Sequence, residues 1–279
     1  MKTRILTAVV SLPIIITAII LPSYVPETVW LFVGIAAFAL AAGLFEFYSL
    51  TKKLELKADA SIGYLGSVAL FMGFVVDAPA KAPDLLILLL ALIVVVALIT
   101  QMFRFQKDFS KMLAGIGVTL LGVFYVAFLG GFLVAIRTGF ENRISLSTHL
   151  LGYFFLVLFG SDIGAYFFGR AFGKHKLAPS ISPGKTVEGL IGGLLFAAAG
   201  AAVATLTFFQ ELPFQWSIPL GLVLAGVGVF GDLAESAMKR GSKTKDAASI
   251  LPGHGGFLDR LDSLLFGAPI LYYFARFYF

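Results

Sequence analysis

The sequence contains no cysteine, which excludes a disulfide framework and any thiolate nucleophile. It has only three histidines, and with no cysteine beside them they argue against a zinc site. Charge is scarce as well: 13% of the 279 residues are charged, whereas 59% are hydrophobic. A water-soluble globule of this size needs more polar residues to cover its surface. The composition therefore indicates an integral membrane protein.

Hydrophobic windows long enough to cross a bilayer core of about 30 Å recur along the chain. They predict nine spans, at 5–22, 28–50, 62–78, 84–101, 112–136, 148–170, 188–209, 216–238 and 262–279. The window at 62–78 is the shortest, so eight spans with a re-entrant segment are an alternative. We therefore predict an all-α, polytopic integral membrane protein with about nine transmembrane helices.

The basic residues alternate between the predicted loops. The N-terminus and the loops after spans 2, 4, 6 and 8 contain two, three, three, four and five Lys or Arg residues, which is 17 of the 21 in the chain. Because cytoplasmic loops are enriched in Lys and Arg, we expect the N-terminus and these loops to face the cytoplasm. The expected location is the cell (inner) membrane.

The polar motifs divide the chain into two regions. Residues 1–145 form an N-terminal region of spans 1 to 5, and residues 146–279 form a region of spans 6 to 9 with the polar loops 171–187 and 239–261. Glu46 is an acid inside the apolar window of span 2. It is either a functional group within the membrane or a side chain that reaches the interface four residues further on.

The most polar stretch is SAMKRGSKTKDAASILPGHGGFLDRLD, residues 236–262, between the last two spans. Its 27 residues contain five Lys or Arg and three Asp. The cations come mostly first, a PGHGG turn follows, and Asp259 and Asp262 open the last span. Cations neutralise phosphate oxygens, glycines let backbone N–H groups approach them, and carboxylates hold a divalent ion against them. The order suits a polyphosphate and its metal, although a charge run is more often a solvated face.

This stretch resembles, from end to end, the signature of the phosphatidate cytidylyltransferases, membrane enzymes that make CDP-diacylglycerol. The positions that carry the resemblance are Ser236, Lys239, Arg240, Lys245, Asp246, Leu251, Pro252, His254, Gly255, Gly256, Asp259, Arg260 and Asp262. A second stretch, from SDIGAYFFGR to SPGKTVEG (161–189), is also similar to the family. The resemblance covers roughly residues 160–265, and the first 145 residues match only in being apolar spans.

The second stretch carries its own candidates. Asp162 lies about eight residues inside span 6, where a carboxylate indicates a polar cavity or a structural partner within the bundle. Ser182, Lys185, Thr186 and Glu188 stand at the start of a predicted helix, whose free N–H groups favour an anion. They also suit a plain helix cap, with Ser182 or Thr186 as the N-cap and Glu188 in the first turn.

Span 8 ends in polar residues that share one helix face: Asp232, Glu235, Ser236 and Lys239. They form either an intrahelical ion network or, together with the start of span 9, a metal site between two helices. Three or four carboxylates with water and phosphate suit Mg²⁺, which prefers oxygen ligands. We therefore predict Mg²⁺ as the cofactor, with Asp232, Asp259 and Asp262 as its ligands.

The resemblance implies transfer of a cytidylyl group from CTP to phosphatidic acid, giving CDP-diacylglycerol and pyrophosphate in phospholipid biosynthesis. We assign catalysis to Lys239 and Arg240 on the transferring phosphate, with Asp232 and Asp259 beside them. The expected substrate-binding residues are Lys185, Ser182, Thr186, Glu188, Asp162, Lys245, His254 and Arg260.

Two other functions are alternatives. A CTP-dependent polyprenol kinase transfers a phosphate to a hydroxyl and needs a base for it, whereas an organic-anion transporter places its ionisable groups near the midplane of the membrane. The expected partners are CTP, phosphatidic acid and the lipid bilayer, with no nucleic acid. The spacing of Gly189 and Gly193 suits helix packing or a homodimer.

Overall fold

The computed structural model describes residues 2–80, 82–105, 109–140, 143–244 and 255–279. Its helices are α1 (Lys2–Ile20), α2 (Val29–Lys53), α3 (Ala60–Ala80), α4 (Asp84–Arg104), α5 (Met112–Gly122), α6 (Leu129–Thr138), α7 (Ile144–Phe172), α8 (Val187–Thr207), α9 (Phe214–Gly241) and α10 (Leu258–Tyr278). The shorter elements are the 3-10 turns η1 (Leu21–Ser23), η2 (Pro26–Thr28) and η3 (Phe109–Lys111), the π-helical turn η4 (Val123–Phe128), and the strands β1 (Lys176–Ala178) and β2 (Ser182–Thr186). The predicted all-α class is confirmed.

Every predicted window corresponds to a helical rod in the described part of the chain. The window at 112–136 is one rod made of α5, η4 and α6, and the short window at 62–78 lies within α3. Seven rods among the described residues are long and apolar enough to cross a membrane, which confirms a polytopic membrane protein. The rods α1 and α10 fall outside that set, so the count of nine spans stays a prediction.

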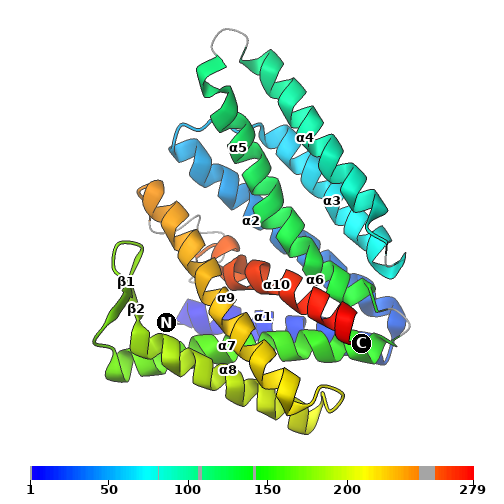
Figure 1. The fold of residues 1–279 in the computed structure, drawn as a ribbon, viewed down its shortest axis with the longest axis vertical. Coiled ribbons are helices and arrows are strands. Elements are labelled where there is room, and N and C mark those ends of the chain that lie inside the picture. The colour runs from blue at the N-terminus through cyan, green and yellow to red at the C-terminus, as the bar shows by residue number, and fades with distance from the viewer. Residues whose placement is uncertain (1, 81, 106–108, 141–142, 245–254) are drawn as a thin grey trace.

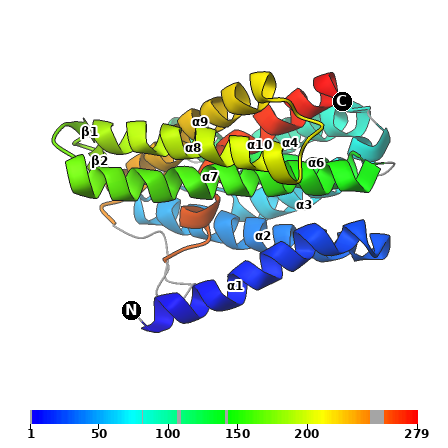
Figure 2. The same cartoon turned by 90° about the horizontal axis from the view of Figure 1, so that it is seen from below.

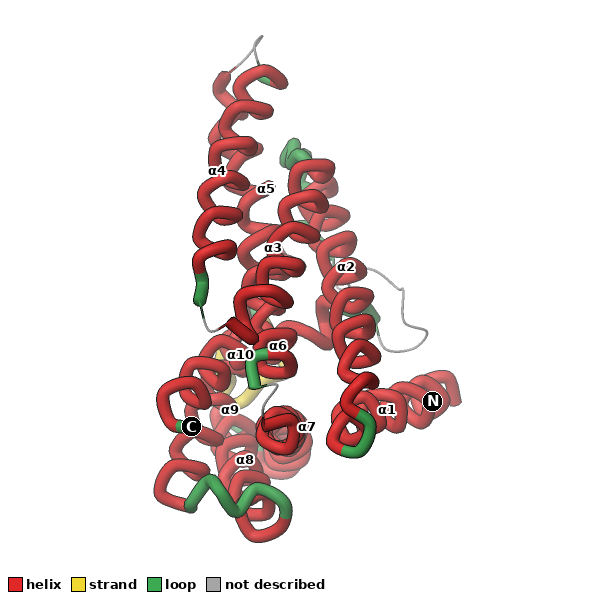
Figure 3. Tube along the Cα trace, turned by 90° about the vertical axis from the view of Figure 1, so that its right-hand side faces the viewer, coloured by secondary structure: helices red, strands yellow, loops and turns green. Residues whose placement is uncertain are grey.

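The helices form two neighbouring groups (Figure 3). Helices α2 to α5 lie in one group and α7 to α10 in the other, with α6 and α10 in contact between them. Figure 1 shows α7 and α8 side by side, with α9 crossing them and α10 between α9 and α6. Helix α1 lies at the edge, beside α2 and α7 (Figure 2).

Small residues allow α7 and α8 to pack at close range. A Cβ on Gly164 would lie 2.5 Å from the carbonyl oxygen of Gly192, which is too close for any larger residue. Gly189 and Gly193 face α7 as well: a Cβ on either would lie 3.0 or 3.1 Å from a carbonyl oxygen of α7, which is closer than an ordinary van der Waals contact. The spacing of these glycines therefore serves helix packing within the chain.

Arg137 on α6 is 1% exposed and fastens α1 to the rest of the protein. Its Nη1 donates hydrogen bonds to the hydroxyls of Ser147 and Thr148, both at 3.0 Å, and its Nη2 donates to the carbonyl oxygen of Ile19 at 3.1 Å. Ile19 lies at the C-terminal end of α1, where the helix dipole is negative. The guanidinium charge is thus met by hydroxyls and a helix end rather than by a carboxylate of the described residues.

We expect the turn between β1 and β2 to face the cytoplasm and the loop between α8 and α9 to face the opposite side. The chain has no native cysteine, so single cysteines at Ser180 and Gln210, both exposed, report on these two loops. A membrane-impermeant thiol reagent applied to intact cells should label the cysteine at 210 and leave the one at 180 unlabelled until the membrane is opened. The reverse labelling pattern would overturn the orientation.

Candidate active site

Four helices meet at one end of the second group, where α7 and α9 end and α8 and α10 begin (Figure 1). A two-stranded antiparallel hairpin, β1 with β2, connects α7 to α8 at this end and pairs Ala178 with Ser182. The sequence predicts only a loop here, so the hairpin is an addition to the all-α fold. It places Ser182 and Lys185 on a strand rather than on the first turn of α8.

A pocket of about 480 Å³ opens between α7, β2, α8 and α9. Its charged lining residues are Asp162, Arg170, Lys185 and Asp232, and hydroxyl groups come from Ser161, Thr186 and Ser263. Leu177, Leu190 and Val229 add apolar walls. The fold therefore brings together four residues that the sequence singled out at separate places, namely Asp162, Lys185, Thr186 and Asp232.

Lys185 and Asp232 form the central ion pair of this pocket. The Lys185 Nζ lies 2.6 Å from Oδ2 of Asp232, and the Ser236 hydroxyl donates to Oδ1 of the same carboxylate at 3.3 Å. Asp162 and Asp262 each interact electrostatically with both Asp232 and Lys185. Three carboxylates from three helices thus share the field of one lysine from the hairpin.

Lys239 lies outside this pocket, between two other carboxylates. Its Nζ is 2.6 Å from Oε2 of Glu235, one helical turn before it on α9, and it also donates a hydrogen bond to Oδ1 of Asp259 on α10. The three side chains are 15%, 1% and 12% exposed, so the ion pairs are largely shielded from solvent. The intrahelical pair that the sequence offered as an alternative is therefore present for Glu235 and Lys239.

Asp259 and Glu46 together hold the beginning of α10. Asp259 Oδ2 accepts a hydrogen bond from the backbone N–H of Gly256 at 2.9 Å. The two oxygens of Glu46 accept from the backbone N–H groups of Phe257 and Leu258, at 2.9 and 2.8 Å. Glu46 is fully buried within the protein, and it does not line the pocket. Its role in this structure is to cap a helix 211 residues further along the chain.

Close contact between α9 and α10 fixes the position of Asp262. A Cβ on Gly231 would lie 2.4 Å from the carbonyl oxygen of Asp262, so only glycine permits this approach. Ser263 strengthens the contact by donating its hydroxyl to the carbonyl oxygen of Gly228 at 3.1 Å. Asp262 is 8% exposed and its Oδ1 accepts the N–H of Ser263 at 2.6 Å. The contact sets Asp262 beside Asp232 on the neighbouring helix.

The hairpin is held against α8 by the residues predicted at the helix start. Thr186 is the N-cap, with its hydroxyl oxygen accepting the N–H of Gly189 at 3.1 Å. The Glu188 carboxylate turns back to the backbone N–H groups of Lys174 and His175 and to the His175 ring, at 2.6 to 3.3 Å. Thr186 and Glu188 thus do what the helix-cap alternative predicted.

Two further predicted residues lie at the edge of the described region. Arg240 is exposed and its Nε donates to the carbonyl oxygen of Ile181 on the hairpin at 3.1 Å. Arg260 begins α10 and interacts electrostatically with Asp162. Lys245 and His254 lie outside the described residues.

The acidic side chains suit a hard divalent cation in their chemistry. All are oxygen donors, and the buried Glu235 carries an oxygen, Oε1, without a hydrogen-bond partner in the described chain. Across residues 2–80, 82–105, 109–140, 143–244 and 255–279, no three carboxylate or imidazole groups converge closely enough to hold an ion by themselves. Mg²⁺ characteristically takes one or two carboxylates and completes its shell with water and substrate phosphates. The residues therefore fit an ion that binds together with a phosphate.

Sequence reasoning missed one polar group near the acids and left Glu235 out of the predicted site residues. The Tyr125 hydroxyl on the π-helical turn η4 is buried, has no hydrogen-bond partner among the described residues, and interacts electrostatically with Asp232, Glu235, Asp259 and Asp262. Glu235 was placed on the polar face of α9, as part of an ion network or a metal site. The tyrosine belongs to an apolar window, and no local pattern in one sequence shows which helix it faces.

The chain resembles proteins of known family along its whole length. The family model described as "Cytidylyltransferase family" matches residues 2–278. A phosphatidate cytidylyltransferase of Bacillus subtilis is 33% identical over 98% of this chain and 97% of its own length. One of Brucella suis is 36% identical over 93% and 91%, and one of Haemophilus influenzae is 46% identical over 45% of either chain.

The Glu46 cap gives a direct test of how the two helix groups are joined. Glu46→Gln leaves a single acceptor oxygen for two N–H groups, and its own NH₂ faces a donor. We expect a loss of about 1–3 kcal/mol of stability, because a buried donor loses its charged acceptor. The measurement is the thermal unfolding midpoint in detergent, which should fall by several degrees.

Glu27→Gln, on the exposed turn η2, is the matched control and should leave the midpoint unchanged. Equal midpoints for the Glu46 variant and the parent protein would show that the cap contributes nothing.

Proposed function

The chain belongs to the cytidylyltransferase family and is a nucleotidyltransferase, and we propose that it transfers the cytidylyl group of CTP to phosphatidic acid. The products would be CDP-diacylglycerol and pyrophosphate, in phospholipid biosynthesis. The support from relatives is their common printed name, phosphatidate cytidylyltransferase, for proteins matched over nearly the whole chain.

The observation that carries the proposal is the pocket at the end of α7, α8 and α9. It combines a lysine, Lys185, with carboxylates on two helices, Asp162 and Asp232. Tyr166, which also lines it, is 58% exposed, and Ile163 beside it is 50% exposed. Apolar exposure of this kind on a membrane helix faces lipid, so a phospholipid can present its phosphate to the pocket while its chains remain in the bilayer.

The transfer needs alignment and charge neutralisation rather than a base. A lipid phosphate oxygen is already ionised near neutral pH and attacks the α-phosphorus of CTP, and the bond from that phosphorus to the pyrophosphate oxygen breaks. Lys185 lines the pocket, where its ammonium group would leave Asp232 and neutralise an oxygen of a bound phosphate. Arg240 bonds the hairpin that carries Lys185 and would hold the transferring phosphate. Arg260 interacts electrostatically with Asp162 and would hold the pyrophosphate or the lipid headgroup.

We propose Mg²⁺ as the cofactor of this reaction. Asp232 and Asp262 would hold it together with phosphate oxygens, because they lie beside one another on α9 and α10. When bound, the ion supplies positive charge that stabilises the phosphates in the transition state. Asp259 is paired with Lys239 in this structure, and its place among the metal ligands stays a prediction.

The buried triad of Glu235, Lys239 and Asp259 would position these groups. It ties α9 to α10 directly beside Asp232 and Asp262, since Lys239 bridges a carboxylate on each helix. In this arrangement Lys239 fixes the crossing of the two helices. Its predicted contact with the transferring phosphate would require it to leave one of its two carboxylates.

Of the alternatives, the polyprenol kinase needs a base for its hydroxyl acceptor, whereas three of the acids, Asp232, Glu235 and Asp259, are each paired with a lysine. A transporter would bind its anion near the middle of the membrane, whereas Lys185 lies on the hairpin and Asp232 in the C-terminal half of α9. We further propose that the pocket faces the cytoplasm from the inner membrane, where CTP is available. The predicted homodimer stays a prediction.

The proposal is tested by supplying purified protein with phosphatidic acid, labelled CTP and Mg²⁺. A lipid-soluble cytidine product and one pyrophosphate per product are expected. Chelation with EDTA should stop the reaction and added Mg²⁺ should restore it. Product formation at the full rate in EDTA would show that the reaction needs no metal ion. Phosphorylation of added polyprenol, with no cytidine lipid formed, would favour the kinase.

Replacement of Asp232 by Asn keeps the shape of the side chain and removes a charge that pairs with Lys185. We expect turnover to fall at least about 100-fold, since a hard-cation site loses a charged ligand, while the protein still inserts and purifies. Asp84→Asn, at the exposed start of α4, is the control and should retain full activity. Ordinary turnover of the Asp232 variant would show that this carboxylate is structural.

A further inference from the structure

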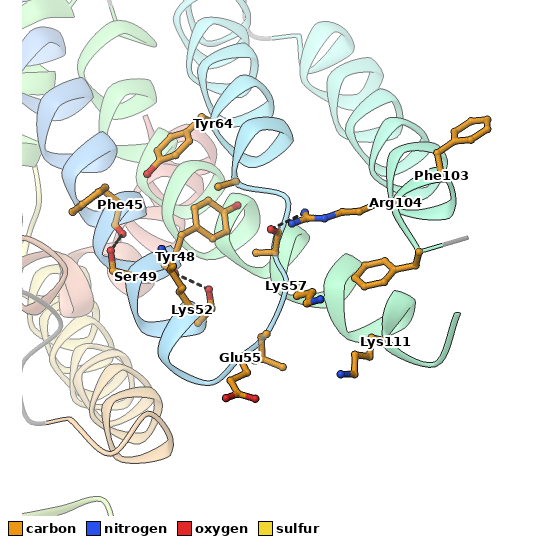
Figure 4. A pocket seen from close by; sticks show the side chains of 15 residues that line it. Phe45, Tyr48, Ser49, Lys52, Glu55, Lys57, Tyr64, Phe103, Arg104 and Lys111 are labelled. Atoms are coloured by element: carbon orange, nitrogen blue, oxygen red, sulfur yellow. Dashed lines mark hydrogen bonds between the residues drawn. The ribbon is translucent and has the colours of Figure 1, made fainter. Parts of the chain in front are cut away.

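A second, larger pocket lies in the other helix group, at the ends of α2 and α4 and the beginnings of α3 and α5 (Figure 4). Its volume is about 1220 Å³, against about 480 Å³ for the candidate active site. None of its lining residues belongs to the candidate active site. Its occupant therefore does not depend on the catalytic assignment.

The rim of this pocket is strongly basic. Lys52, Lys57, Arg104 and Lys111 line it, whereas Glu55 is its one acidic lining residue among the described residues. Arg104 is held in place by the carbonyl oxygen of Ala58, to which its Nη1 donates at 3.0 Å, and the same nitrogen lies 3.8 Å from Oδ2 of Asp59. The three lysines are exposed and form no ion pair with any described residue. The three lysines thus carry positive charge that the described protein leaves unpaired.

The walls of the pocket are apolar and aromatic. Phe45, Tyr48, Tyr64, Phe103 and Phe105 line it, and Phe45 and Phe103 are 54% and 60% exposed. Only 17% of the most apolar stretch of α4 is buried inside the protein, so this helix faces lipid over most of its surface. Basic side chains at the rim suit an anionic head group, and apolar walls that open toward the bilayer suit acyl chains. The pocket therefore fits an amphiphile with an anionic head.

The back wall of the pocket is built rigidly. The Tyr48 hydroxyl donates to the carbonyl oxygen of Thr119 at 2.9 Å, and its ring fits against Gly63 and Gly122. A Cβ at either glycine would lie within 3 Å of the tyrosine side chain. Thr119 also accepts the N–H of Asp59 at 2.8 Å, which fixes the turn that leads into α3. The cavity is therefore a preformed feature of these four helices rather than a gap left by loose packing.

We propose that this pocket binds an anionic phospholipid of the adjoining leaflet, with its phosphate among Lys52, Lys57, Arg104 and Lys111 and its acyl chains along α4. The positive-inside tendency accounts for lysines at this end of the helices. It does not account for a preformed cavity beneath them, nor for the aromatic walls. A nucleotide or free phosphate would gain nothing from side chains that open onto lipid, whereas a phospholipid uses both parts of the site.

The site can be tested with a fluorescent reporter on its wall. Phe103→Trp is introduced after Trp30 and Trp216, both exposed, have been replaced by Phe. The protein is placed in phosphatidylcholine nanodiscs without CTP, and brominated phosphatidic acid or brominated phosphatidylcholine is added at the same low mole fraction. Bromine quenches tryptophan on contact, so we expect stronger quenching by the anionic lipid.

The basic rim should be responsible for that preference. Lys57→Gln with Lys111→Gln should weaken the apparent affinity for brominated phosphatidic acid roughly tenfold or more, because each lysine near a membrane surface contributes attraction to an anionic lipid. Lys53→Gln, an exposed neighbour that does not line the pocket, should leave it unchanged.

Three results would overturn the site. Equal quenching by the two brominated lipids would show that the pocket does not select an anion. An unchanged preference in the double variant would place the anion elsewhere. Loss of the preference on adding millimolar inorganic phosphate would show that the rim binds a soluble anion instead of a lipid.

Discussion

The architecture depends on one buried carboxylate that accepts hydrogen bonds from a distant helix. Glu46 sits inside α2, and its two oxygens receive the N–H groups that open α10. A charge with no water around it is costly unless such donors surround it, so the carboxylate and the helix end stabilise one another. Gly256 permits the approach, since a Cβ there would lie 2.2 Å from a Glu46 oxygen. Because α10 also carries Asp259 and Asp262, the acids of the candidate site are placed by a residue of the other helix group.

The same principle of paired charge organises the site itself. Lys185 comes from the hairpin and Lys239 from α9, and each forms an ion pair between two elements: Lys185 joins the hairpin to α9, and Lys239 joins α9 to α10. Each lysine has its own partners: Lys185 pairs with Asp232, and Lys239 pairs with Glu235 and Asp259. Two ion clusters therefore stand side by side, one open to the pocket and one shielded. The open cluster is the one whose lysine can exchange a carboxylate for a phosphate.

Much of this arrangement could be predicted from the sequence, and there are physical reasons why the rest could not. Apolar windows located every helical rod, because a membrane demands long uninterrupted hydrophobic runs. The cap at Thr186 and the polar face of α9 followed from local rules of spacing. The partners of Glu46 and Lys185 did not follow, since they lie 211 and 47 positions away and pairing over such distances leaves no periodic trace. The hairpin could not be predicted, because its strands are only three and five residues long and show no alternation of apolar and polar residues.

The hydrogen bonds of Arg137 hold α1, but they can form only long after α1 has been synthesised. Arg137 holds the last turn of α1 through the carbonyl oxygen of Ile19, and its other bonds go to Ser147 and Thr148 at the beginning of α7. During synthesis from the N-terminus, α1 enters the membrane long before any of these three residues has been joined to the chain. Helix α1 therefore stays without these hydrogen bonds until α6 and the start of α7 have been synthesised.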